Sequence, residues 1–171
     1  ETSSPAMYIL VSSNFERLLW HLRVQYEFDM NPERRVEVSV RNAGAKIHKW
    51  FLHLKSTGSF TVELGMLELA KELFGTYRVS NEETIDAIRR CYRGEIIEKK
   101  GYVLDPHSAI GVAASLREIK AEPQDGTHTI ALATAHPAKF SKAVEQALHA
   151  EKDFKFESVL PEEFVGLEQK E

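Results

Sequence analysis

The chain has 171 residues, a formal net charge of −4 and 43% hydrophobic residues, which predicts one domain over residues 1–171 with a real core. Acidic and basic residues are mixed along the chain, which argues against a nucleic-acid partner, and no apolar run is long enough to cross a bilayer. The single cysteine, Cys91, excludes a disulfide within the chain and favours a reducing, cytoplasmic compartment.

The first part of the chain has the residue spacing of a helix. Ser13 and Glu16 form the pattern of a capping box, so we expect a helix to begin there. It should stop near Pro32, because the residue before a proline is pushed out of the helical region. Before this helix, the apolar residues 8–11 are compatible with a short strand.

Three more helices are predicted before residue 100. Residues 43–58 and 62–75 both have helical spacing and end on a glycine, which suits the position just after a helix. Ser80 and Glu83 form a second capping box and begin the next helix. That helix should end at Gly94.

Two strand–helix units follow in series, over residues 102–120 and 127–150. Each begins with an apolar, β-capable run and passes into a helix whose first turn holds a proline, Pro106 or Pro137. A short helix within residues 160–169 is expected to come last. This alternation after a helical region predicts an α/β fold, with part of an open parallel sheet flanked by helices.

The two strand–helix junctions carry polar side chains that could face a ligand. Asp105 and His107 lie at the first junction, and Thr134 and His136 lie at the second. In open parallel sheets ligands bind at the carboxyl ends of the strands, where helix N-termini favour anions. A neutral hydroxyl such as that of Thr134 can bond a ring nitrogen without adding charge. A threonine at a strand end is more often a helix cap, so the spacing leaves both roles open.

Other common kinds of site are not indicated. The chain has neither a cysteine pair nor a His-Glu-x-x-His motif, so no metal site is expected. It also lacks a glycine-rich phosphate loop and a Gly-x-Ser-x-Gly nucleophile motif. Cys91 lies on an amphipathic helix, which favours a core position over a nucleophile.

Five stretches of the chain match one family in order. They are Ser4-Pro5-Ala6-Met7, Ser13-Asn14-Phe15-Glu16-Arg17, Asp105-Pro106-His107-Ser108-Ala109, Ala133-Thr134-Ala135-His136-Pro137-Ala138-Lys139-Phe140, and Leu160-Pro161-Glu162-Glu163-Phe164. Together they resemble the C-terminal part of threonine synthase in its fungal and bacterial branch. That family usually has Asp in place of Tyr8, Thr in place of Ser108 and Ser in place of Ala133.

This resemblance implies a lyase of the tryptophan synthase β-like fold that depends on pyridoxal 5'-phosphate. The family converts O-phosphohomoserine and water to threonine and phosphate, with the cofactor acting as the electron sink. By the resemblance, Thr134 is the hydroxyl that meets the pyridine nitrogen, and Ala135 and His136 form the pocket wall. Asp105 and His107 are further candidates for shaping the pocket.

The resemblance also implies that part of the site lies outside this sequence. The family's lysine that forms a Schiff base with the cofactor belongs to a Phe-Lys-Asp motif before Ser-Pro-Ala-Met, and this motif does not occur in the chain. We therefore expect a C-terminal segment of a longer enzyme, inactive by itself, whose partner is the remainder of the enzyme chain. The alternative is a non-catalytic interaction module derived from threonine synthase. An upstream Phe-Lys-Asp segment in the natural protein would distinguish the two.

Overall fold

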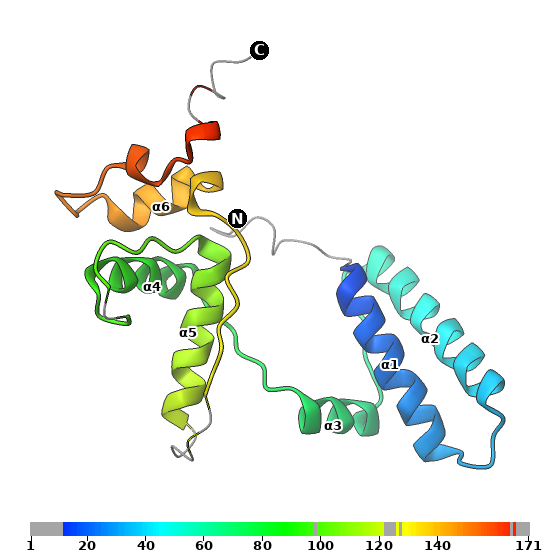
Figure 1. Ribbon diagram of the computed structural model, residues 1–171. Coiled ribbons are helices and arrows are strands. Elements are labelled where there is room, and N and C mark those ends of the chain that lie inside the picture. Colours follow the sequence, from blue (N-terminus) through cyan, green and yellow to red (C-terminus); the bar gives the residue numbers. More distant parts are fainter. Residues whose placement is uncertain (1–11, 98, 122–125, 127, 165, 167–171) are drawn as a thin grey trace. The chain divides into compact units, whose positions relative to one another are not determined.

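The computed structural model describes residues 12–97, 99–121, 126, 128–164 and 166 (Figure 1). Within these ranges the regular elements are all helical, and no strand is present. The described residues divide into two compact units, the first ending at Thr76 and the second running from Tyr77 onward. None of the helices in these ranges is long and apolar enough to cross a membrane.

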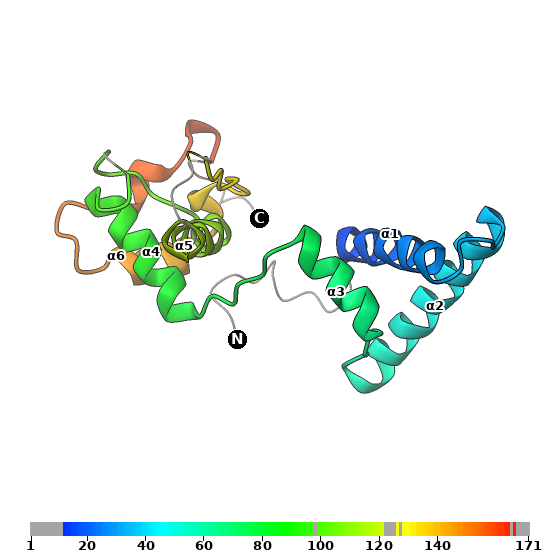
Figure 2. The ribbon, with the colours of Figure 1, turned by 90° about the horizontal axis from the view of Figure 1, so that it is seen from below.

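The first unit consists of α1 (Ser13–Met30), α2 (Val36–Thr57) and α3 (Leu64–Leu73). Figures 1 and 2 show α1 and α2 as a helical hairpin, and α1 also contacts α3. Their buried apolar side chains form one core: Leu19, Leu22, Ile47, Trp50, Phe51, Leu54 and Met66. The Trp50 ring stacks on Phe60, with ring centroids 5.6 Å apart.

The helix boundaries in this unit follow the predicted caps only in part. The N-cap of α1 is Ser12, whose hydroxyl accepts a hydrogen bond from the Phe15 N–H, so the predicted capping box one residue later is wrong. α2 begins at Val36, well before the predicted start at residue 43. Ser39 and Ala43 are fully buried, so packing against the rest of the unit stabilises the helix although the sequence there is polar. Its predicted end is confirmed at Gly58, which has a left-handed φ of 81°.

The described residues of the second unit form three α-helices and three short 3-10 turns. The α-helices are α4 (Asn81–Arg93), α5 (Pro106–Ala121) and α6 (Ser141–Leu148), and the 3-10 turns are η2 (Pro137–Lys139), η3 (Phe156–Val159) and η4 (Glu162–Phe164). α4 packs against both α5 and α6. Their shared core consists of Ile85, Ala87, Ile88, Cys91, Leu104, Ala109, Val144, Ala147 and Leu148.

The predicted start of α4 is confirmed in detail. The Ser80 hydroxyl accepts from the Glu83 N–H at 3.2 Å, and the Ser80 N–H donates to the Glu83 carboxylate at 2.7 Å. These reciprocal bonds satisfy two backbone groups at the helix start. The end is also as predicted, since Gly94 has a left-handed φ of 78°. α5 begins at Pro106 as expected.

The helix predicted after Pro137 is split in two. Pro137 opens a 3-10 turn, and α6 begins only at Ser141. Along this stretch Phe140 is half-buried, whereas Val144 and Leu148 are fully buried. The apolar face is therefore the expected one, although the helix is shorter.

The predicted parallel sheet is wrong. Residues 102–105 and 128–134 are neither helix nor strand, and the predicted strand at 8–11 lies outside the described residues. A strand requires a neighbour that pairs with its backbone N–H and C=O groups, and neither segment has such a neighbour among the described residues. Ile130 and Leu132, which made the second segment resemble a buried strand, expose 80% and 75% of their surface.

Cys91 belongs to the core of the second unit and is 1% exposed. Burial raises the pKa of its thiol, and only the thiolate reacts rapidly with disulfide reagents. We expect Ellman's reagent to leave Cys91 unmodified in the folded chain at neutral pH and to modify it fully in guanidinium chloride. Rapid modification without denaturant would show that α4 is not packed as described.

Candidate functional site

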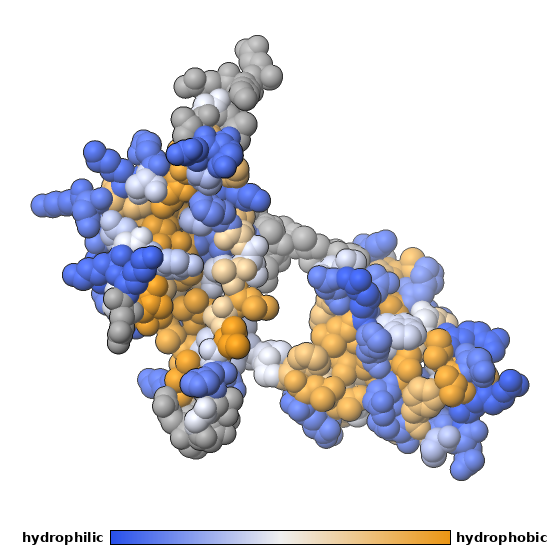
Figure 3. Space-filling view, in the orientation of Figure 1, coloured by the Kyte–Doolittle hydropathy of each residue, from blue (hydrophilic) through white to orange (hydrophobic). Residues whose placement is uncertain are grey.

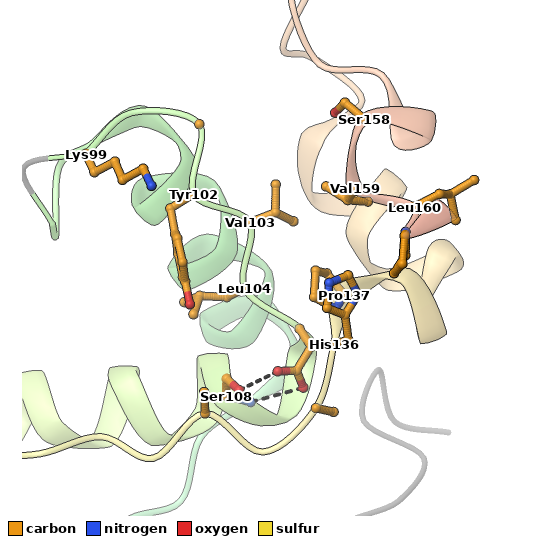
Figure 4. A pocket seen from close by; sticks show the side chains of 15 residues that line it. Lys99, Tyr102, Val103, Leu104, Ser108, His136, Pro137, Ser158, Val159 and Leu160 are labelled. Atoms are coloured by element: carbon orange, nitrogen blue, oxygen red, sulfur yellow. Dashed lines mark hydrogen bonds between the residues drawn. The ribbon is translucent and has the colours of Figure 1, made fainter. Parts of the chain in front are cut away.

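A cavity of about 470 Å³ opens in the second unit between three segments of the chain, 99–105, 133–137 and 158–161. Figure 4 shows Tyr102 and Leu104 on the side opposite Val159 and Leu160. A cavity of this size suits a small-molecule ligand. Both predicted strand–helix junctions, around Asp105 and around Thr134, contribute residues to its walls. The two junctions are therefore neighbours, although no sheet joins them.

The structure brings together three of the five candidate residues at this cavity. Asp105, Ala135 and His136 line it. Thr134 does not line it, although Ala133 and Ala135 on either side do, and the Thr134 side chain is exposed. The backbone thus presents Thr134 away from this cavity.

Asp105 is a buried carboxylate, 1% exposed, at the start of α5. Its Oδ1 accepts from the backbone N–H groups of His107 at 2.9 Å and Ser108 at 3.2 Å, and its Oδ2 accepts from the Ser108 hydroxyl. These are the bonds of an N-cap residue, and the proline that follows has no N–H to satisfy. The charge is tolerated in the interior because helix N–H groups and a hydroxyl surround it.

His107 is also buried, but it does not line the cavity. Its Nδ1 lies 3.3 Å from Asp105 Oδ1, and its ring packs against Phe140 with centroids 4.6 Å apart. Neither ring nitrogen has a hydrogen-bond partner among the described residues. His107 therefore helps to pack α5 against the turn before α6.

His136 caps the 3-10 turn that follows it. Its Nδ1 accepts from the Ala138 N–H at 3.3 Å, so in the neutral ring the proton lies on Nε2. The exposed ring can thus offer Nε2–H as a hydrogen-bond donor. The described residues contain no group of histidine, cysteine or acidic side chains placed to hold a metal ion.

Ser108 is the site residue that sequence reasoning did not single out. Its hydroxyl accepts from the Thr134 N–H at 3.0 Å and thereby joins the two junctions. The available signal was its position three residues after Asp105, where a hydroxyl can reach the cap. Nothing in the sequence showed that Thr134, 26 residues later, would be the other partner.

Comparison with known proteins places this arrangement in one family. The family model described as "Threonine synthase, C-terminal" matches residues 108–171, which run from the first turn of α5 through the cavity wall at 133–137. The threonine synthase of Schizosaccharomyces pombe is 46% identical over 98% of this chain. The chain belongs to the threonine synthase family.

Solved structures of the threonine synthase family agree with this assignment. The crystal structure of threonine synthase from yeast matches all of this chain with 42% identity and a TM-score of 0.82, and this chain covers 32% of it. A PLP-bound threonine synthase from Brucella melitensis matches with 33% identity and a TM-score of 0.66, and 30% of it is covered. The chain spans 30–31% of the length of the curated fungal relatives that it matches.

Proposed function

We propose that this chain is the C-terminal part of a threonine synthase that converts O-phosphohomoserine and water to threonine and phosphate with pyridoxal 5'-phosphate. The observation that carries this proposal is the match to threonine synthases over nearly the whole chain. The chain spans about a third of these relatives, so its proposed partner is the rest of the enzyme, which supplies the lysine.

Thr134 does not line the cavity, but its exposed side chain could reach a cofactor ring that extends beyond the cavity along segment 133–137. Its side chain is exposed, and its hydroxyl has no hydrogen-bond partner among the described residues, so it is available to a ligand. The bound cofactor would supply an electron sink for charge that develops on the substrate. A neutral hydroxyl can hydrogen-bond the pyridine nitrogen without adding charge beside it. Thr134 would therefore orient the ring while leaving the nitrogen free of a charged partner.

Ala135 and His136, on the same segment as Thr134, line the cavity itself and would form part of its wall around the ligand. The small side chain of Ala135 leaves room for a ligand in the cavity that it lines. The Nδ1 atom of His136 accepts a hydrogen bond from the Ala138 N–H, which fixes the orientation of the ring and leaves Nε2–H as a donor to a ligand. Asp105 also lines the cavity, but its carboxylate already accepts hydrogen bonds from the first turn of α5, so it would stabilise the wall rather than bind the ligand.

Exposed apolar side chains support the proposal that the rest of the enzyme packs against this chain. Figure 3 shows apolar side chains at the surface of the second unit, and Ile130 and Leu132 are 80% and 75% exposed. Burying a side chain of this size stabilises a protein by roughly 1.5–3 kcal/mol, and the chain lacks this stabilisation while both side chains are exposed to water. We propose that segment 128–134 packs against the rest of the enzyme, which would also hold Thr134 at the shared site.

Replacing Thr134 by valine in the full-length enzyme tests this assignment. The change keeps the shape of the side chain and removes the hydroxyl, so we expect the Kd for pyridoxal phosphate to rise roughly tenfold and kcat to fall. The cofactor Kd is measured by titrating the apoenzyme and following its fluorescence. Thr134→Ser, which keeps the hydroxyl, should stay within about twofold of the wild type. Equal affinities for all three proteins would show that Thr134 does not contact the cofactor.

A further inference from the structure

A chain of hydrogen bonds runs from the interior of the second unit to the proposed cofactor contact. At its inner end, the Asp105 carboxylate is 1% exposed and is held by two backbone N–H groups at the start of α5. Its second oxygen accepts from the Ser108 hydroxyl, as the dashed lines in Figure 4 show. The backbone of α5 therefore fixes the orientation of the Asp105 side chain, and Asp105 in turn fixes the orientation of the Ser108 hydroxyl.

The direction of these bonds follows from the chemistry of a hydroxyl. A serine hydroxyl has a single proton, and here Ser108 donates it to a carboxylate that can only accept. Its oxygen keeps lone pairs, and one of them accepts the Thr134 N–H at 3.0 Å. A hydroxyl whose proton is donated to a carboxylate is a stronger acceptor, since hydrogen bonds in a series polarise one another.

The Ser108 bond is placed to control where Thr134 lies. Figures 1 and 2 show segment 128–134 running beside α5, and it belongs to no helix or strand. Among the described residues, the bond to Ser108 is the one hydrogen bond that joins this segment to α5. The bond holds the backbone of Thr134 itself, while the Thr134 hydroxyl has no partner there.

We infer that Ser108, held by Asp105, is a positioning residue that sets the place of the Thr134 hydroxyl at the cofactor. The inference rests on the proposed function, because it assumes that Thr134 contacts the cofactor ring. Asp105 and Ser108 lie in the cavity wall but are only 1% and 3% exposed, and the inference gives them no direct contact with substrate or cofactor. Their effect reaches the cofactor only through the backbone of Thr134.

A double-mutant cycle in the full-length enzyme tests the inference, with the Kd for pyridoxal phosphate as the readout. We expect Ser108→Ala to raise this Kd about fivefold, the effect of losing one hydrogen bond. In the Thr134→Val background the same change should alter the Kd by less than about twofold, because the hydroxyl being positioned is already gone. Ser108→Thr, which keeps the hydroxyl, should restore wild-type affinity.

Each outcome of the cycle has a definite meaning. If Ser108→Ala weakens binding equally in both backgrounds, or not at all in the wild type, Ser108 has only a structural role and the inference is wrong. If Thr134→Val alone leaves the Kd unchanged, the proposed cofactor contact is wrong as well. Should Ser108→Ala fail to fold, Ser108→Cys takes its place in the cycle, since a thiol nearly keeps the packing but is a weak acceptor.

Discussion

Expressed alone, residues 1–171 should release no phosphate from O-phosphohomoserine, even with pyridoxal phosphate added. The reaction needs a lysine that bonds the cofactor and moves protons at the substrate. The Phe-Lys-Asp motif that carries this lysine in the threonine synthase family is absent from the 171 residues. In addition, the proposed contact through Thr134 is a single neutral hydrogen bond, which is too little to hold a phosphorylated cofactor in place.

Phosphate release and lysine labelling measure this expectation together. The chain is incubated with the cofactor, reduced with borohydride and mapped by mass spectrometry, and the full-length enzyme is treated in parallel as the control. We expect scattered, substoichiometric labelling in the chain and one specific lysine adduct in the full-length enzyme. A single stoichiometric adduct in the chain, together with phosphate release, would contradict the need for an upstream lysine. A natural protein without an upstream Phe-Lys-Asp segment would favour the non-catalytic module.

Replacing Ile88 by alanine should cause the largest loss of stability in the second unit. Ile88 is 0% exposed and lies on α4, the helix that packs against both α5 and α6. The change removes buried methyl groups and leaves a cavity that three packed helices cannot easily close. Large-to-small changes of this kind cost roughly 2–5 kcal/mol, and we expect about 3 kcal/mol here. Urea unfolding followed by circular dichroism measures the loss.

Ile130→Ala is the matched control for this prediction, because it makes the same chemical change at a side chain that is 80% exposed. In the 171-residue chain it should change the free energy of unfolding by less than about 0.5 kcal/mol. If the two variants lose the same stability, then Ile88 is not at the centre of the core. A larger effect of Ile130→Ala in the full-length enzyme than in the chain would support the proposed packing of segment 128–134.

Features set by neighbouring residues were predictable from the sequence. The Ser80–Glu83 capping box, the glycine ends of α2 and α4 and the proline start of α5 depend on bonds or dihedral angles within a few positions. The family motifs also placed Asp105, Ala135 and His136 in segments that do meet at one cavity.

Pairing between distant segments could not be predicted in this way. Residues 128–134 have the composition of a buried strand, yet they form no strand in the described chain, because composition does not create the second backbone that a strand must bond. The early start of α2 likewise depends on burial of Ser39 and Ala43, which the polar pattern does not show.

Local chemistry in the sequence therefore determined the helix caps and the polar residues of the two junctions. Only the tertiary structure decided which junction residues act together. The Ser108 hydroxyl donates to Asp105 and accepts from Thr134, which lies 26 positions after Ser108. Such a link has no sequence signature, because it depends on where α5 packs and not on any spacing along the chain.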